Sequence, residues 1–191
     1  MELAAQVIGI FGMASNIISY QFKKRKGVLL CLLTGGVLFA VNMFMLGAIM
    51  GGILNLLSVL RAILFMNPDK PILPKKILTT LFIITFAASY ALTFTLLGKE
   101  ATPSNLVLEL LPVIGSIAMT VSFSMNTSGA IRIAGFISSP CWLIYNCFVF
   151  SIGGILCEVI SLISIITAVI RLDRRGSKDD TREAENEDSI A

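Results

Sequence analysis

The chain has 191 residues, of which 55% are hydrophobic and 14% charged, and its mean hydropathy is +0.86. Soluble domains contain fewer apolar and more charged residues, so the composition indicates a membrane protein without a separate soluble catalytic domain. The formal net charge is +3 and there is no histidine, which removes the commonest general base and the usual partner of cysteine in metal sites. We therefore expect neither an enzyme nor a bound metal or cofactor, and no binding of nucleic acid.

Seven apolar segments follow along the chain, each about long enough to cross the roughly 30 Å apolar core of a bilayer as an α-helix. No basic n-region precedes the first segment, so we expect it to remain as a span and not to be cleaved as a signal peptide. The uncharged run Gly27–Leu60 is too long for one span and must reverse near Gly47–Gly52, because glycine permits tight turns. The expected spans are 3–22, 27–46, 49–66, 77–98, 106–125, 131–150 and 152–170.

An internal repeat groups these spans into two halves. Val7-Ile8-Gly9 recurs as Val113-Ile114-Gly115, and Gly51-Gly52-Ile53-Leu54 recurs as Gly153-Gly154-Ile155-Leu156. The two pairs differ slightly in offset, so aligning both requires a short gap. Laying Phe39–Arg61 on Trp142–Ser164 without gaps gives three identities in 23 positions, which chance similarity between apolar helices also produces. Parallel repeats are a known transporter design. We expect three-helix bundles over 3–66 and 106–172, a linker helix over 77–98 (a 3+1+3 layout) and, because 173–191 is charged and lacks aromatic residues, a disordered tail there.

The basic residues gather on one side of this layout. Of 15 lysines and arginines, 13 fall in loops 1–2, 3–4 and 5–6 or in the C-terminal tail, and only Lys99 lies on the other side. Cytoplasmic loops carry such an excess. We therefore predict a multi-pass protein of the bacterial inner membrane, with the N-terminus outside and the C-terminus in the cytoplasm. The last of the 15, Arg61, lies near the end of its span and is expected to snorkel to the interface.

Two acidic residues lie inside apolar segments, where a carboxylate is costly and usually faces the bundle interior or water. Glu158 is expected either to bind a cationic group or exchange a proton during transport, or to be a structural acid bonded to Asn146, Tyr145 or the backbone. Glu109 lies only a few residues inside the outer surface. Its position favours a solvated or helix N-terminal role over a place in a pocket.

Trp142 lies about ten residues from each end of its span. That depth is too great for the interfacial belt of aromatic residues, so we expect Trp142 to form the wall of a pocket. Asn55 and Asn146 either hydrogen-bond a solute or tie helices together, and both interpretations stay open, whereas Asn42 is expected to be a tie. The four cysteines are expected to be buried free thiols.

Several of these motifs together resemble a known family. They are Glu109-Leu-Leu-Pro112-Val-Ile-Gly115, Cys141-Trp142-Leu-Ile-Tyr145-Asn146, and Ser151-Ile-Gly-Gly154 through Glu158, and they look like the bacterial inner-membrane YgjV family. The resemblance covers most of the chain and is best over 107–172. More distantly, Trp142-Leu-Ile-Tyr145 with a polar residue 16 positions after the tryptophan is similar to the SWEET, SemiSWEET and PQ-loop (MtN3-like) superfamily of sugar and amino-acid transporters, which are built of triple-helix bundles.

The distant resemblance implies a central pocket formed by matching residues of the two halves. It places Trp142 and Glu158 in the second half, and Phe39 and Asn55, again 16 positions apart, in the first. Glu158 stands where the superfamily has an asparagine, and Phe39 replaces a tryptophan. The proline-glutamine signature is absent, since the proline at 112 is followed by valine. These departures weigh against a neutral sugar as the solute.

From these observations we expect a transporter of a small sugar-like or amino-acid-like solute, with proton coupling through Glu158 as one option. Alternating access would occur around Phe39, Asn55, Trp142 and Glu158, with Asn146 as a further candidate for binding the substrate. The alternative is a non-transporting membrane protein that binds a partner or lipid, in which these residues pack together without a cavity. Membrane lipids are expected contacts in either case, and the sequence leaves the oligomeric state open.

Overall fold

The computed structural model of the chain describes residues 1–19, 25–65, 73–125 and 128–188. Within these ranges it consists of seven α-helices and no strand: α1 (Glu2–Ser19), α2 (Arg25–Met45), α3 (Ile49–Leu64), α4 (Lys75–Thr95), α5 (Pro103–Met125), α6 (Ser128–Val149) and α7 (Ile152–Asp188). Three of them can cross a membrane by length and composition, namely α4, α5 and the Ile152–Ile170 part of α7. The apolar stretches described in the other helices are shorter and cover Glu2–Ile18, Leu30–Met45, Ile49–Leu64 and Ile133–Val149. The predicted all-α membrane fold is thus confirmed.

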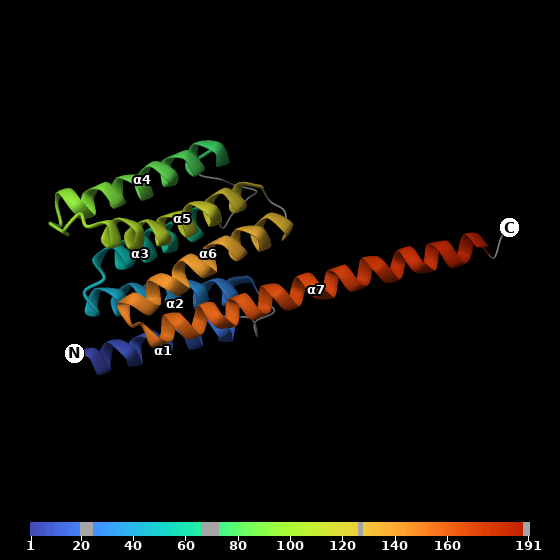
Figure 1. Ribbon diagram of the computed structural model, residues 1–191, viewed down its shortest axis with the longest axis horizontal. Coiled ribbons are helices and arrows are strands. Elements are labelled where there is room, and N and C mark those ends of the chain that lie inside the picture. Colours follow the sequence, from blue (N-terminus) through green and yellow to red (C-terminus); the bar gives the residue numbers. More distant parts are fainter. Residues whose placement is uncertain (20–24, 66–72, 126–127, 189–191) are drawn as a thin grey trace.

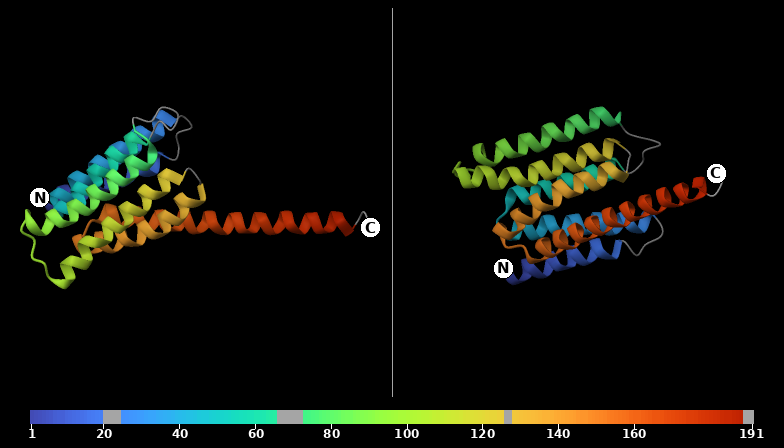
Figure 2. Two further views of the ribbon diagram at one scale, coloured as in Figure 1. Left: turned by 90° about the horizontal axis from the view of Figure 1, so that it is seen from above. Right: turned by 45° about the vertical axis from the view of Figure 1, so that its right-hand side comes forward.

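Successive helices lie side by side and run in opposite directions (Figures 1 and 2). The N-terminus and the 2–3, 4–5 and 6–7 connections lie at one end of the bundle, which we call the N-terminal end. Helices α1, α3 and α5 finish at the opposite end, which we call the basic end because most lysines and arginines fall at that end of the predicted layout. Which end faces the cytoplasm stays a prediction.

The helices pack in matching pairs. Helix α1 packs on α2 as α5 packs on α6, α2 on α3 as α6 on α7, and α1 on α7 as α5 on α3. Helix α4 lies at the edge, where it contacts α5 and α3 (Figure 1). Exchanging α1–α3 with α5–α7 therefore leaves the neighbours among these six helices unchanged, whereas α4 packs mainly on α3 and α5. This packing supports the predicted repeat, although the complete 3+1+3 arrangement stays a prediction.

The two turns at the N-terminal end have the same backbone geometry. Gly47, between α2 and α3, has a φ of 77°, and Phe150, between α6 and α7, has a φ of 60°. In each turn the following residue donates its N–H to the carbonyl five positions earlier, at 2.9 Å for Ala48 and 3.0 Å for Ser151. Gly47 and Phe150 stand 103 positions apart, as do Ala48 and Ser151, which is the register of the ungapped repeat.

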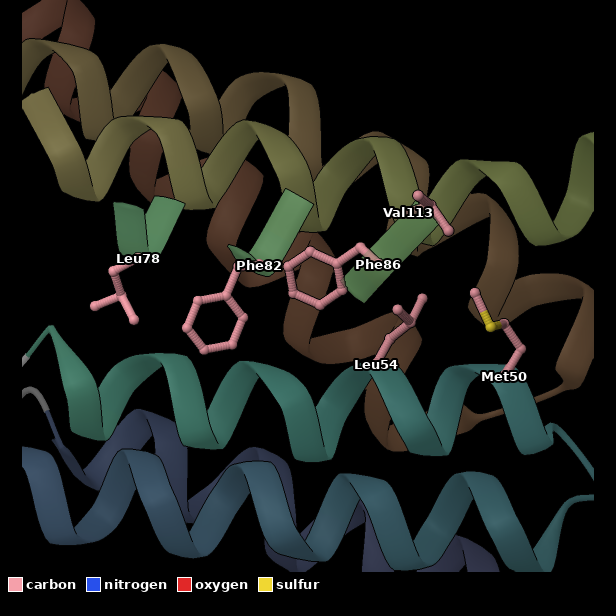
Figure 3. Packing of buried hydrophobic residues seen from close by; sticks show 6 residues of the cluster. All are labelled: Met50, Leu54, Leu78, Phe82, Phe86 and Val113. Atoms are coloured by element: carbon pink, nitrogen blue, oxygen red, sulfur yellow. The ribbon is translucent and has the colours of Figure 1, made fainter. Parts of the chain in front are cut away.

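An apolar cluster attaches α4 to the rest of the bundle (Figure 3). Its buried members come from α3, α4 and α5 and are Met50, Leu54, Leu78, Phe82, Phe86 and Val113. The rings of Phe82 and Phe86 lie 5.9 Å apart. Large apolar side chains such as Phe11, Ile84 and Phe148 are exposed on the outside of the bundle, as expected where lipid replaces water.

Helix α7 continues to Asp188, well beyond the bundle (Figure 1), where the composition predicted a disordered tail from residue 173 onward. Low hydrophobicity prevents this segment from building a core of its own. It does not prevent a helix that is already formed from lengthening, since each added residue gains a hydrogen bond without a new nucleus. The four cysteines are free, as predicted, but they are not fully buried: Cys31, Cys141 and Cys157 are partly buried and Cys147 is exposed.

The paired turns lead to a reciprocal prediction. A left-handed conformation costs a non-glycine residue about 1–2 kcal/mol, and Phe150 is exposed, so it loses little burial when shortened. No atom lies within 4 Å of a Cβ built on Gly47. We expect Phe150→Gly to raise and Gly47→Ala to lower the free energy of unfolding, each by about 1 kcal/mol. Thermal unfolding in detergent measures both, and shifts in the same direction would contradict the turn geometry.

Candidate functional site

A cavity of about 480 Å³, which we call the central cavity, lies between the two halves of the bundle. All five side chains singled out in the sequence line it: Phe39, Asn55, Trp142, Asn146 and Glu158. The wall also contains six serines: Ser58, Ser116, Ser138, Ser139, Ser161 and Ser164. The volume falls in the range of small-molecule pockets, and the lining mixes aromatic, apolar and polar groups.

Most lining residues form pairs in which the members stand 103 positions apart, like the two turns. The eight pairs are Asn16 and Met119, Leu32 and Gly135, Gly36 and Ser139, Phe39 and Trp142, Met43 and Asn146, Asn55 and Glu158, Ser58 and Ser161, and Arg61 and Ser164. They account for 16 of the 21 lining residues. Equivalent positions of the two halves therefore face one shared space, as the ungapped repeat predicts.

Trp142 forms the wall where α5 meets α6. Its ring lies 5.9 Å from that of Tyr145 in an edge-to-face arrangement, with an interplanar angle of 84°. A Cβ built on Gly115 would lie 3.0 Å from the indole Cδ1 atom, so the glycine gives the indole its room. The side chain is therefore held at mid-bundle between two neighbours, as expected of a pocket wall and not of an interfacial belt.

The α6–α7 side of the cavity is rich in hydrogen-bond acceptors. The carboxyl group of Glu158 lies beside Ser139. Gly154 lies one turn earlier on α7 and leaves space for the Asn146 amide. A Cβ at position 154 would collide with that amide. The amide oxygen of Asn146 is buried and has no hydrogen-bond partner among the described residues. Tyr145 is the other side chain expected to bond Glu158 if Glu158 is a structural acid. Among the described residues, the Tyr145 hydroxyl accepts from Gly51, and no hydrogen bond between Tyr145 and Glu158 is found.

Arg61 corrects one prediction, because its side chain does not snorkel to the interface. It is 7% exposed and lines the cavity. Its Nη1 atom donates to the carbonyl of Ser116 at 2.7 Å and to the hydroxyl of Thr120 at 2.9 Å, both on α5. The rings of Phe86 and Phe123 lie 5.9 and 5.2 Å from the guanidinium carbon, within cation–π range. These contacts offset the cost of burial and hold the charge inside the bundle.

Hydrogen bonds join the two halves at the N-terminal end. Asn42 donates its amide N–H to the carbonyl of Ala5 at 2.7 Å, and the Ser151 hydroxyl donates to the Asn42 amide oxygen at 2.7 Å. The Gln6 side chain donates to the Phe150 carbonyl at 2.6 Å and accepts from the backbone N–H after Ser151 at 3.0 Å. Asn42 is thus a helix tie, as predicted, and with Ser151 it is fully buried.

Tyr145 adds a second connection at this end. Its hydroxyl accepts a hydrogen bond from the backbone N–H of Gly51 at 3.1 Å. Gly51 lies in the first turn of α3, where backbone N–H groups have no partner within the helix. A side chain of the second half therefore caps a helix of the first, and Tyr145 is completely buried as a result.

Glu109 corrects a second prediction. It is neither solvated nor a free helix N-terminal charge, because it is 2% exposed and forms an ion pair with Lys99. It also lies close to the Tyr145 hydroxyl and is not among the residues that line the central cavity. The ion pair thus lies beside the hydrogen bond between Tyr145 and Gly51, and Lys99 balances the charge of the buried Glu109 carboxylate.

Sequence reasoning missed the position of Arg61 on the cavity wall and the hydrogen bond of Tyr145 to Gly51. A signal existed for Arg61, since the ungapped repeat aligns it with Ser164, three residues past the matched serine Ser161 on the cavity face. None existed for Tyr145, whose role depends on how closely α6 approaches α3. The ion pair of Glu109 was equally hidden, because its partner lies in a loop.

The fold and the site define a polytopic helical membrane protein with a partly polar cavity at the centre of its bundle. The model of the Imp-YgjV family, described as bacterial inner membrane protein, matches residues 3–176, and the chain belongs to this family. This confirms the resemblance to that family and the membrane in which the protein resides. No curated protein and no solved structure matches the chain.

The capping role of Tyr145 is tested by removing its hydroxyl. Tyr145→Phe leaves the Gly51 N–H buried and unpaired, so we expect a loss of about 1–3 kcal/mol in the free energy of unfolding. Tyr90→Phe is a matched control, because the Tyr90 hydroxyl makes an exposed hydrogen bond to Leu106. Thermal unfolding in detergent should separate the two variants clearly. Equal melting temperatures would show that Tyr145 caps nothing.

Proposed function

We propose that this protein moves a small solute across the bacterial inner membrane by alternating access around the central cavity. The observation that carries the proposal is the pairing of lining residues. Two equivalent sets of positions face one space of about 480 Å³, which is the arrangement that lets two bundles rock about a fixed site. Trp142 and Phe39 would contact the solute's apolar parts, and Asn55, Asn146 and Glu158 its polar groups.

The alternative of a non-transporting protein predicts that these residues fill the interior against one another. The presence of a cavity among them weighs against that alternative. The hydrogen bonds of Asn42, Ser151 and Tyr145 join the halves at the N-terminal end. We infer that the present conformation is closed at that end and that solute and water enter from the basic end, on the cytoplasmic side in the predicted orientation.

Water access is testable with cysteine labelling in a chain freed of its four native cysteines. Ser161→Cys places a thiol on the cavity wall, whereas Ile163→Cys, 59% exposed on the same helix, faces lipid. A lipid-facing thiol stays protonated, so a charged, impermeant methanethiosulfonate should modify Ser161→Cys at least about tenfold faster. We expect this in inside-out vesicles and not in spheroplasts. Equal rates at the two positions would contradict an aqueous cavity.

Transport itself is measured by counterflow in proteoliposomes with a panel of radiolabelled amino acids and sugars. We expect exchange of at least one solute, a loss of about tenfold or more for Trp142→Ala, and little change for Phe148→Ala, which truncates an aromatic residue that is 74% exposed. No exchange of any solute by correctly folded protein would favour the non-transporting alternative.

A further inference from the structure

The central cavity is lined by one basic and one acidic residue that are not paired with each other. Arg61 and Glu158 both line it, yet among the described residues the single ion pair is Lys99 with Glu109. Arg61 reaches from α3 and is held on α5, whereas Glu158 lies on α7 beside Ser139 of α6. The positive group therefore belongs to the α3–α5 side of the cavity and the negative group to the α6–α7 side.

The guanidinium of Arg61 is only partly used by the protein. Its Nη1 atom is occupied by Ser116 and Thr120, and Phe86 and Phe123 hold its faces. Its Nε–H is buried and has no partner in the described part of the chain. A guanidinium presents its N–H groups as a fork that matches a carboxylate. An anionic oxygen in the cavity would satisfy the donor that the protein leaves open.

The opposite wall offers two hydrogen-bond acceptors, and the Ser139 hydroxyl lies beside one of them. The unpartnered amide oxygen of Asn146 lies against Gly154, about one turn of α7 before Glu158, and both residues line the cavity. An ammonium group has three N–H donors and no acceptor. It would therefore donate hydrogen bonds to the acceptors of this wall, just as a carboxylate would accept a hydrogen bond from Arg61.

On the basis of the proposed transport function, we propose that the solute is dipolar, an amino acid whose carboxylate binds Arg61 and whose ammonium group binds Glu158 and Asn146. A neutral solute would bring no opposite charge to either Arg61 or Glu158, and a singly charged solute would bring one to only one of them. The equivalent positions Ser164 and Asn55 carry no charge, so the two poles are not duplicated by the repeat. The cavity would then accept the solute in one orientation only.

The test is thermal stabilisation of the full chain in lipid nanodiscs by matched probes. Glycine, 4-aminobutanoate and 6-aminohexanoate present both charges at three separations, butanoate and butylamine present one charge each, and glucose presents none. We expect one of the amino acids to bind at least about tenfold more tightly than the singly charged probes and glucose. Uptake of the same probes into proteoliposomes is measured in parallel.

Two variants assign the poles. Glu158→Gln should remove the advantage of the amino acid over butanoate, and Arg61→Gln should remove its advantage over butylamine. If Arg61→Gln does not fold, Glu158→Gln alone decides, because it keeps the shape of the side chain. Glucose or butylamine binding more tightly than every amino acid would overturn the dipolar solute while leaving transport intact. Absence of transport for every solute of the wider counterflow panel would instead remove the proposed function itself.

Discussion

The junction between the two halves at the N-terminal end is the constraint on which the rest of the structure depends. Lipid is as apolar as the helix surfaces, so burial of leucine or isoleucine does little to choose one helix packing over another, and interhelical hydrogen bonds contribute only about 0.6–1.7 kcal/mol each. The helix packing is therefore selected by contacts that can form in only one arrangement of the helices. Ser151 reaches Asn42 only because α1 and α7 approach so closely that a Cβ on Gly153 would collide with the backbone of Gly9.

The cavity follows from that junction. With the halves joined at one end and matched turns at Gly47 and Phe150, equivalent faces of the helices are brought toward a common space. The positions where the halves differ then carry the distinctive chemistry. Asn55 occupies the position equivalent to Glu158, and Ser164 occupies the position equivalent to Arg61. The two halves therefore share a framework but enclose a site that is electrostatically asymmetric. Duplication accounts for the shape, and divergence at a few positions accounts for the charge.

The sequence predicted the fold well because its evidence was local. Span lengths and the reversal near Gly47–Gly52 are readable from apolar runs and glycines. The ungapped register is supported in the sequence by only three identities in 23 positions, and the structure places Phe39, Asn55, Trp142, Asn146 and Glu158 on one cavity. Arg61 was misplaced because its environment is set by another helix, and Glu109 because its partner Lys99 lies in the preceding loop. The length of the Arg61 side chain permits either snorkelling or a contact with α5, and only the packing of α3 on α5 decides.

The most direct test of the account is a distance measured by electron–electron double resonance between spin labels at Leu3 on α1 and Val107 on α5. Both positions are exposed and lie at the N-terminal end, one in each half. If the junction holds a two-state bundle closed, Ser151→Ala should add a second, longer distance to the single one of the parent protein. A single unchanged distance in a Ser151→Ala protein of undiminished helix content would contradict alternating access about this cavity.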